Sequence, residues 1–475
     1  QGDWNSQLKY SKANIRTNVD FEVTKSTRVK TNILAIFMET NGVPNVNSND
    51  AWWHLYKVPA LAFPIKTQQG TWGGSQTYGD FNLLAKSQGA GFTKTHQRQI
   101  WADITLEQDL YMILKGLQFY VGGSYDNASN TIENRTKGYQ YGWNYYGADG
   151  AMQETVMGTI EDKLVFNHWV DSQWRAGTIK TGFKYATQFR NGDNLAANLN
   201  YNLKSEFRDG QSNTWHRQNV ALAAHYDHAN KLMVDLVLAA NGSNRSYPAK
   251  WAFSPTLGLG WIYANNPDKG LYGKLRASAG IQHTDYVPAA GLWLDRWNSS
   301  HGDFFYGNNF AQSWGAFITQ FPTTSFRQEA AYKANIGTDI RVAGCLDIVA
   351  DVFYQQRRNI LVQANALNSS VVGIQSAYDD KGAVASYGGE LGLRFAKTFG
   401  NGLNVNASAF ATYSRNEIIE WIENPVYPNM SVIGTPADAA RGLVALGFFE
   451  SQEDIDNSPL QQFGQVKVGD IKYKD

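Results

Sequence analysis

The sequence predicts an all-β fold of antiparallel strands, because two patterns recur along its 475 residues. The first pattern is an alternation of apolar and polar residues. In "LNVNASAFATY", residues 403–413, the odd positions are apolar and most even positions are small and polar, with Phe410 as the exception. Successive side chains of a strand point to opposite faces, so each such segment has one apolar and one polar face. The same alternation occurs in residues 15–23, 195–203, 274–281 and 333–342.

The second pattern lies in the connections between these segments. Six short segments, five of which contain Gly, Asn or Asp, and one looser segment fit hairpin turns, because these three residue types adopt the positive φ angles that tight turns need. These seven turns fall at residues 24–27, 108–115, 190–194, 227–230, 267–270, 343–345 and 399–402. Mostly longer segments separate the hairpins, with large loops expected near residues 39–94, 127–175, 284–330, 359–385 and 416–475. Seven hairpins give about fourteen strands.

Long loops that alternate with short turns favour a membrane barrel. Loops of this length are uncommon in a compact soluble domain. An outer-membrane barrel, by contrast, carries short periplasmic turns at one rim and long extracellular loops at the other. We therefore expect residues 1–475 to form one antiparallel transmembrane β-barrel domain in the bacterial outer membrane, with outer-membrane lipid on the apolar face and a wet lumen inside. A soluble β-sandwich has the same strand period and is the alternative.

Charge and cysteine content exclude several other classes of function. The 42 Lys and Arg residues balance the 42 Asp and Glu residues, so we expect no nucleic-acid partner. The single cysteine, Cys345, cannot form an intramolecular disulfide and lacks the Cys or His neighbours of a zinc site. No apolar run reaches the roughly 18 to 20 residues that a membrane helix requires.

The sequence contains no convincing catalytic or metal-binding motif. The HExxH, GxSxG and P-loop patterns are absent from the chain. His225 and His228 are three positions apart, a spacing that points their side chains to opposite faces of a strand. We therefore predict no enzyme activity, no cofactor and no metal site.

Aromatic residues gather in the predicted extracellular loops, in "AWWHLY" (51–56) and "YQYGWNYY" (139–146). Flat rings can stack on sugar faces or cover apolar peptide side chains. The expected ligand-binding residues are Trp52, Trp53, Trp72, Tyr141, Trp143 and Tyr145. Alternatively, these rings pack the loops against one another or against a partner.

Several longer motifs resemble those of the SusC/RagA family of TonB-dependent outer-membrane transporters. The segment "NGSNRSYPAKWAFSPTLGLGW" (241–261), followed by "KLRASAG" (274–280), resembles one signature block of the family. Three later segments are similar to its following motifs, in the order of the family: residues 332–361, "SYGGELGLRF" (386–395) and residues 447–475. Together these motifs cover about the last half of the chain.

The resemblance implies a 22-stranded barrel with an N-terminal plug, a segment that contacts TonB, and a terminal strand with an aromatic end. None of these three features is recognised here, so we expect the chain to be the central barrel portion, with about four strands missing on each side. The implied function is TonB-dependent import of an oligosaccharide or oligopeptide, with a SusD-like surface lipoprotein as partner and the TonB complex contacted through segments absent here.

Two other functions fit the residues without the resemblance. One is a passive, porin-like channel of fourteen strands, since even-numbered barrels of this size occur. The other is a soluble carbohydrate-active enzyme or lectin with a Trp-lined cleft. Neither the aromatic rings nor the polar loops distinguish a glycan from a peptide.

Overall fold

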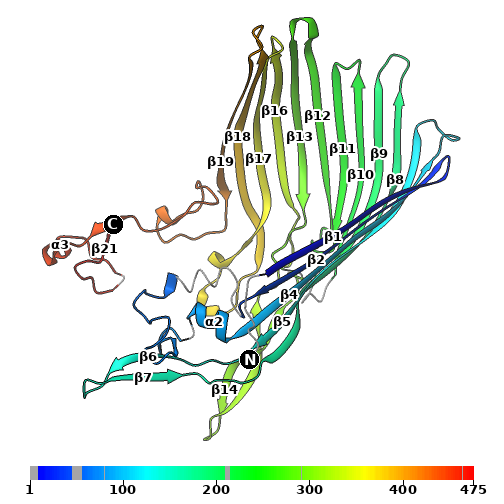
Figure 1. The fold of residues 1–475 in the computed structure, drawn as a ribbon. Helices are drawn as coiled ribbons and strands as arrows, with labels where there is room; N and C mark the ends of the chain where they lie inside the picture. Colours follow the sequence, from blue (N-terminus) through cyan, green and yellow to red (C-terminus); the bar gives the residue numbers. More distant parts are fainter. Residues whose placement is uncertain are drawn as a thin grey trace.

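Fourteen strands form a single antiparallel sheet in the computed structural model, which describes residues 9–44, 56–79, 81–208, 214–289, 291–462 and 464–474. The strands follow one another in sequence order across the sheet (Figure 1). They are β1 (Lys9–Thr24), β2 (Thr27–Gly42), β4 (Gly91–Asp109), β5 (Leu117–Thr136), β8 (Val165–Gln188), β9 (Asn194–Arg208), β10 (Trp215–His228), β11 (Leu232–Ser243), β12 (Trp251–Asn266), β13 (Leu271–Thr284), β16 (Glu329–Val342), β17 (Leu346–Gln363), β18 (Tyr378–Thr398) and β19 (Asn404–Glu420). The predicted all-β class and strand number are confirmed.

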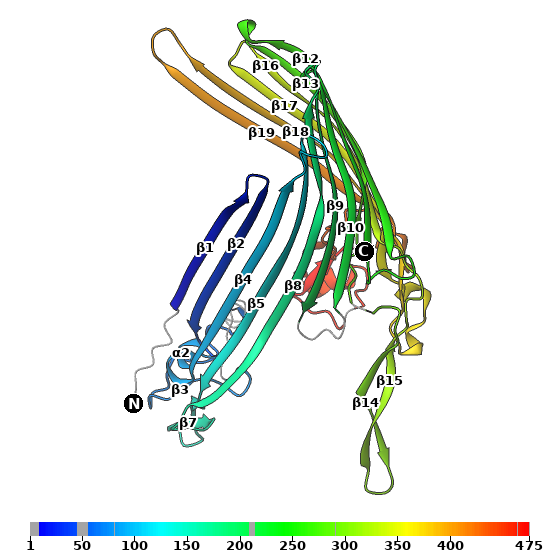
Figure 2. The same cartoon turned by 90° about the vertical axis from the view of Figure 1, so that its right-hand side faces the viewer.

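The sheet curves strongly but does not close on itself. β1 and β19 stand at its two ends, and no pairing joins them within the described part of the chain (Figure 2). An unpaired edge exposes a row of backbone N–H and C=O groups. The fourteen strands therefore form an open section of a barrel, and the closed fourteen-stranded channel considered from the sequence is not the arrangement observed.

Strand register keeps the apolar faces together. Ile336 on β16 lies opposite Ala277 on β13 and Val352 on β17, and Ala277 lies opposite Leu259 on β12. Directly opposed residues of antiparallel strands share a face of the sheet. A shift of one residue would turn a whole strand over, so the alternation seen in the sequence fixes this register.

Side-chain exposure identifies which face is concave. Glu107, Tyr120, Ala221 and Ala239 belong to one cross-strand row on the polar face, and each exposes less than a tenth of its surface. On the apolar face, by contrast, Ile336 is 62% exposed. Side chains converge on the inside of a curved sheet and spread apart on the outside. The polar face is therefore concave and the apolar face convex.

The seven predicted turns connect neighbouring strands along one rim of the sheet. Two of them pack together, because the Gly344 N–H donates a hydrogen bond to the Gly270 carbonyl oxygen at 2.8 Å. Both glycines have positive φ angles, 58° for Gly270 and 66° for Gly344. A Cβ atom at Gly270 would lie 2.3 Å from the Gly344 nitrogen, so only glycine allows this contact.

Asp193 joins two neighbouring turns of this rim. Its Oδ2 atom accepts a hydrogen bond from the Tyr226 hydroxyl at 2.6 Å, and its Oδ1 atom lies 3.0 Å from Nδ1 of His228 and accepts from the Ala229 N–H at 3.2 Å. Asp193 is only 2% exposed. The bonds from Tyr226 and His228 lower the pKa of Asp193 to about 2.

We expect Asp193→Asn to lower the urea midpoint for unfolding, because the charged acceptor of these bonds is lost. A carboxyl group whose pKa is lower in the folded state stabilises the protein above its unfolded pKa of about 4, and this stabilisation is lost as the pH falls toward 2. The difference between wild type and variant should therefore shrink between pH 4 and pH 2. Asp268→Asn, in an exposed turn, is the control. If the difference in urea midpoint between wild type and Asp193→Asn did not change with pH, the charged form of Asp193 would not be what stabilises the two turns.

The opposite rim carries the long connections, which are shorter than the sequence suggested and contain structure of their own. β5 continues to Thr136 and β8 begins at Val165, so the loop expected at 127–175 spans 137–164. Ladder hydrogen bonds continue here after the apolar alternation has ended, which the sequence pattern does not reveal. β17 and β18 extend in the same way to Gln363 and from Tyr378.

Small elements occupy these loops and the C-terminal segment. They are β3 (Trp72–Gly73), α2 (Leu83–Gly89), β6 (Tyr141–Tyr146), β7 (Met152–Met157), β14 (Arg296–Tyr306), β15 (Ala311–Gln320), η2 (Asn365–Leu367), η3 (Ser370–Val372), η4 (Pro428–Met430), β20 (Ala445–Phe448), α3 (Gln452–Asp456) and β21 (Ile471–Tyr473). A further short helix, η1 (Pro267–Lys269), forms one of the turns. Among the described residues, no helix has the length and apolar character needed to cross a membrane.

Candidate ligand-contact surfaces

A small sheet in the loops brings four of the six predicted ligand-binding residues together. The strands β3, β6 and β7 form this sheet, and β3 pairs with β6 so that Trp72 lies opposite Tyr141. Tyr141, Trp143 and Tyr145 are alternate residues of β6 and therefore share one face. The other two predicted residues, Trp52 and Trp53, lie outside the described residues.

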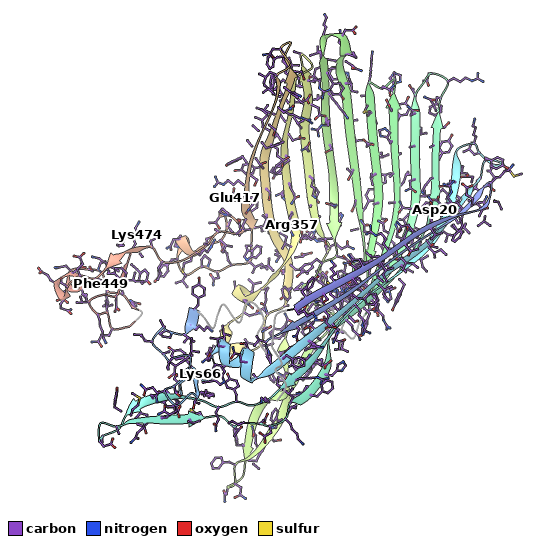
Figure 3. The ribbon with its side chains drawn as sticks, viewed as in Figure 1. Asp20, Lys66, Arg357, Glu417, Phe449 and Lys474 are labelled. Atoms are coloured by element: carbon purple, nitrogen blue, oxygen red, sulfur yellow. The ribbon has the colours of Figure 1, made fainter. Side chains whose placement is uncertain are left out.

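The aromatic rings of this sheet differ in how closely they pack against other residues of the loops. Lys66, labelled in Figure 3, belongs to the same loop region, and its Nζ atom lies 4.5 Å from the centre of the Trp72 ring. Tyr141 packs edge-on against Tyr139 with ring centres 6.4 Å apart. Trp72 and Tyr141 are half-buried. Tyr145 is 43% exposed, and its hydroxyl donates a hydrogen bond to Gln153 Oε1 at 2.8 Å. The rings at the Trp72 end of the small sheet therefore pack against other loop residues, whereas the ring of Tyr145 is exposed enough to contact a ligand.

The polar concave face carries ion pairs between strands. Glu107 on β4 contacts the Nζ atoms of Lys30 on β2 at 2.8 Å and of Lys184 on β8 at 3.1 Å. Glu107 is 9% exposed at its side chain, while the lysines are 34% and 47% exposed. One buried carboxylate therefore neutralises two partly exposed cations and connects three elements of the wall.

Trp215 forms a second cluster, at the loop rim, that the sequence patterns did not indicate. The guanidinium carbons of Arg217 and Arg245 lie 3.4 Å and 3.8 Å from the centre of its ring, a close cation–π arrangement. Its indole N–H donates to Asp285 Oδ2 at 2.7 Å, and Arg217 Nε donates to the same oxygen at 3.0 Å. The cluster ties β10 to the segments that follow β11 and β13. Only the short "TWHR" sequence at the start of β10 could have suggested it.

Each histidine of the "HYDH" sequence lies against one aspartate. Nδ1 of His225 lies 2.7 Å from Asp235 Oδ1, and His228 contacts Asp193 in the turn described above. Across the described ranges, no three His, Cys, Asp or Glu side chains are grouped so that they could hold a metal ion.

Solved structures of a peptide transporter share this fold, although no protein-family model and no curated protein sequence matches the chain. A structure of the RagAB peptide transporter matches with a TM-score of 0.65 and 12% identity, covering 91% of this chain and 50% of that one. The RagAB peptide importer matches in its closed-closed state (TM-score 0.61, 13% identity, 90% and 50% covered) and in its open-open state (0.65, 12%, 93% and 50%).

At this level of identity the match concerns the fold. The chain spans about half the length of the RagAB chains that it matches. The outer-membrane location predicted from the sequence agrees with a fold of this kind. The apolar convex face and the polar concave face of the sheet agree with the same location. The resemblance predicted from the sequence motifs is thus confirmed for the architecture: this chain has the fold of about half of a SusC/RagA-type outer-membrane barrel chain.

Proposed function

We propose that this chain is the barrel section of a SusC/RagA-type importer, which takes up oligopeptides or oligosaccharides across the bacterial outer membrane in a TonB-dependent manner. The observation that carries the proposal is the match of 91% of the chain to the RagAB peptide transporter, with a TM-score of 0.65. The solved structures that it matches are named as transporters and importers, which favours transport over catalysis.

The two faces of the sheet support a transport role. A convex apolar face suits contact with lipid, and a concave wall of Asn, Lys and carboxylate side chains suits the passage of a hydrated solute. The aromatic sheet of β3, β6 and β7 lies at the loop rim, where a solute would arrive from outside. We assign first contact with the solute to Trp143 and Tyr145, with Trp52, Trp53, Trp72 and Tyr141 as further predicted contacts.

The hairpin of β14 and β15 is the surface that we assign to a SusD-like lipoprotein partner. It projects away from the rim of the sheet (Figure 2) and exposes large rings, with Trp297, Trp314 and Phe310 at 61%, 62% and 75% exposed. A two-stranded hairpin is only marginally stable alone in water. Burial of these rings against a second protein would stabilise both the hairpin and the complex.

Uptake should depend on the TonB system. In cells that express the full-length protein, we expect uptake of a labelled oligopeptide or oligosaccharide to fall to background when TonB is deleted, while binding at the cell surface persists. Energy coupling is needed because a plugged barrel offers no passive path. Uptake that continues unchanged without TonB would overturn the importer and favour a passive channel. A deletion of the barrel gene gives the background level.

Removal of two rings should weaken binding of the solute. We expect Trp143→Ala with Tyr145→Ala to lower the affinity of the purified protein for its solute by about threefold to tenfold for each ring, the range typical of one aromatic contact. Tyr146→Ala is the matched control, because Tyr146 is 73% exposed on the opposite face of the same strand. Equal affinities of the double variant and the wild type in a titration would show that these rings only pack the loop.

A further inference from the structure

A hollow of about 650 Å³ lies on the convex face, where β2, β4, β5, β8 and β9 run side by side (Figure 2). Its floor consists of small residues, Ala102, Gly123 and Gly177. Ala102 is five positions from Glu107 and Gly123 is three positions from Tyr120, so both turn away from the concave row that those two residues mark. Apolar side chains that are about half exposed stand around the floor: Ile33, Ile104, Tyr125 and Ile179. The surface that faces lipid therefore has an apolar furrow here.

Two arginines stand at the end of this hollow that is nearer the loop rim. Arg175 precedes Gly177 by two residues on β8, and Arg98 precedes Ala102 by four residues on β4, distances of about 7 and about 13 Å along the strands. Only β5 separates these two strands, so the two side chains start about 10 Å apart and can reach one group between them. Both arginines are exposed, and neither makes an ion pair with another residue that the structure describes.

The neighbours of these arginines leave their charge uncompensated. The residues directly opposite them are aromatic or neutral: Phe37 and Ser129 for Arg98, Asn127 and Phe207 for Arg175. The guanidinium carbon of Arg175 lies 5.1 Å from the centre of the Phe207 ring. On β2 and β4 the apolar positions of the convex face end at Phe37 and Ile100, and the next convex pair is Glu39 with His96, 3.4 Å apart. The two cations thus lie where the apolar surface ends, and an anion from outside the chain would neutralise them.

A second hollow of the convex face, of about 420 Å³, ends differently. It lies on β11, β12, β13, β16 and β17, and apolar residues such as Leu236, Leu257 and Ala334 line it. Its side toward the loop rim carries Tyr332 and Tyr354. Tyrosine rings are common where a membrane protein meets the lipid headgroups, and they bring no charge. The pair of arginines therefore distinguishes the hollow on β4, β5 and β8.

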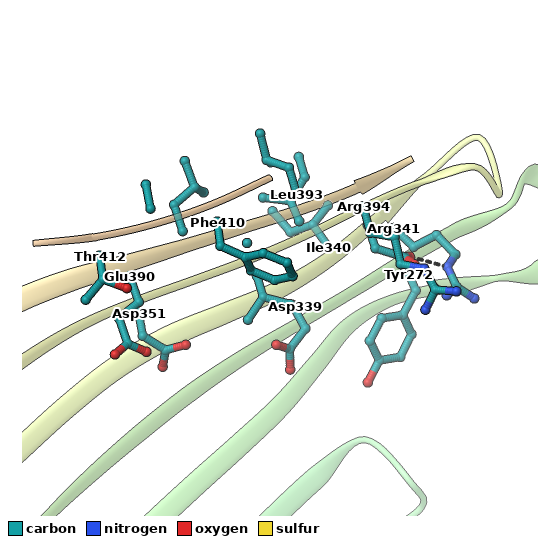
Figure 4. Close-up of a pocket in the computed structure, with 16 residues that line it drawn as sticks. Tyr272, Asp339, Ile340, Arg341, Asp351, Glu390, Leu393, Arg394, Phe410 and Thr412 are labelled. Atoms are coloured by element: carbon teal, nitrogen blue, oxygen red, sulfur yellow. Dashed lines mark hydrogen bonds and ion pairs between the residues drawn. The ribbon is translucent and has the colours of Figure 1, made fainter. Parts of the chain in front are cut away.

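A third hollow, of about 770 Å³, belongs to the opposite face of the sheet (Figure 4). Val349, Gly392 and Phe410 lie opposite one another on its floor. Phe410 is the apolar exception in the alternation of β19, so its ring stands on the concave face, with charged residues such as Asp351 and Arg341 nearby. The concave face surrounds the interior of the barrel, where we expect the plug. Only the hollows of the convex face can contact membrane lipid.

We propose that the hollow on β4, β5 and β8 binds a phosphorylated lipid of the outer leaflet. The phosphate group lies between Arg98 and Arg175 and accepts charge-assisted hydrogen bonds from both guanidinium groups. One acyl chain lies along Ala102, Gly123 and Gly177, toward the middle of the membrane. Basic side chains beside an apolar membrane surface bind anionic headgroups in this way. This site needs only the outer-membrane location and does not depend on the importer function.

Native mass spectrometry of the full-length protein in mild detergent tests the phosphate contact. The probes are phosphatidic acid and diacylglycerol with the same acyl chains, which differ only in the phosphate group. We expect the wild type to bind phosphatidic acid about twentyfold more tightly than diacylglycerol, because each arginine contributes about fivefold. Arg98→Gln and Arg175→Gln should each weaken binding of phosphatidic acid about fivefold and leave diacylglycerol unchanged. Arg16→Gln, an exposed arginine on the concave face of β1, is the control and should change neither affinity.

A side chain that fills the hollow tests the acyl contact. A Cβ atom at Gly177 would meet no atom within 4 Å, so a leucine fits there and occupies the space of the acyl chain. We expect Gly177→Leu to weaken binding of both lipids about tenfold, as when roughly two methylene groups are no longer buried. Gly389→Leu adds the same side chain to the convex face on β18, outside the hollow, and should leave both affinities unchanged. The heat-modifiable mobility of each variant on gels checks its assembly.

Four results would overturn this lipid site. Equal affinities of the wild type for the two lipids, or an unchanged preference in both arginine variants, would remove the phosphate contact. Displacement of phosphatidic acid by millimolar inorganic phosphate would mean that the arginines bind a free anion. Unchanged lipid affinities of Gly177→Leu would exclude the acyl chain from the hollow. Lipid-free pairs of protein chains as the main species would mean that this face packs against a second copy.

Discussion

Ile336→Lys is expected to prevent most of the protein from assembling in the outer membrane. Ile336 lies near the middle of β16 on the convex face, 62% exposed and flanked by Ala277 and Val352. A lysine on the lipid face of a barrel destabilises it by about 2 to 4 kcal/mol near the bilayer midplane and by less near the interfaces. Ala407→Lys, close to the turn rim on β19, should therefore have a smaller effect.

The matched control for this lysine is its neighbour. Asn335→Lys places the same charge one residue earlier on β16, where the side chain points to the polar, concave face. The measurement is the fraction of protein that shows heat-modifiable mobility in isolated outer membranes. We expect this fraction to fall sharply for Ile336→Lys and to stay near the wild-type value for Asn335→Lys. Equal assembly of both variants would mean that the convex face does not contact lipid.

Glu107→Gln is expected to destabilise the folded barrel by about 1 to 3 kcal/mol. The substitution removes the carboxylate that lies 2.8 Å from Lys30 and 3.1 Å from Lys184, and it leaves two neighbouring ammonium groups without their counter-charge. Because both lysines are partly exposed to water, the effect should stay below that of a fully buried pair. Reversible urea unfolding of the full-length protein in detergent or lipid vesicles measures it.

Glu22 provides the control for this ion pair. It contacts Arg28 at 3.0 Å in the same cross-strand row, but it is 73% exposed. An exposed pair contributes between about 0 and 1 kcal/mol, so Glu22→Gln should change the unfolding free energy by no more than this. If Glu107→Gln were as mild as Glu22→Gln, burial would not strengthen the Glu107 contacts, and the network would be incidental to stability.

The strand order and the turns could be predicted from the sequence because both signals are local. Alternation along a strand and a turn of a few residues each need only a short window of sequence. The ends of β5 and β8 could not be predicted, because their pairing continues to Thr136 and from Val165 through residues in which the alternation of apolar and polar positions breaks down. The residue patterns also could not show whether the sheet closes into a barrel, because the pattern of each strand does not reveal whether the first strand pairs with the last.

The candidate sites depend on contacts between distant residues, and the sequence shows these only in part. The aromatic residues of β6 could be selected by type, but their pairing with Trp72, about seventy residues earlier, needed the structure. Phe410 was visible as an exception to the alternation. The charged residues around it belong to neighbouring strands, and only the register of β17, β18 and β19 places them beside its ring.

Intact mass, measured on native protein extracted from outer membranes in mild detergent with identification of the chains that copurify, tests the central claim most directly. The open edges of β1 and β19 and the half-length match to RagAB predict a polypeptide much heavier than 53.0 kDa. The proposed importer function adds the expectation that a surface lipoprotein copurifies with it. A single chain of 53.0 kDa without a companion would contradict the importer, because the barrel would then have to close on these fourteen strands alone.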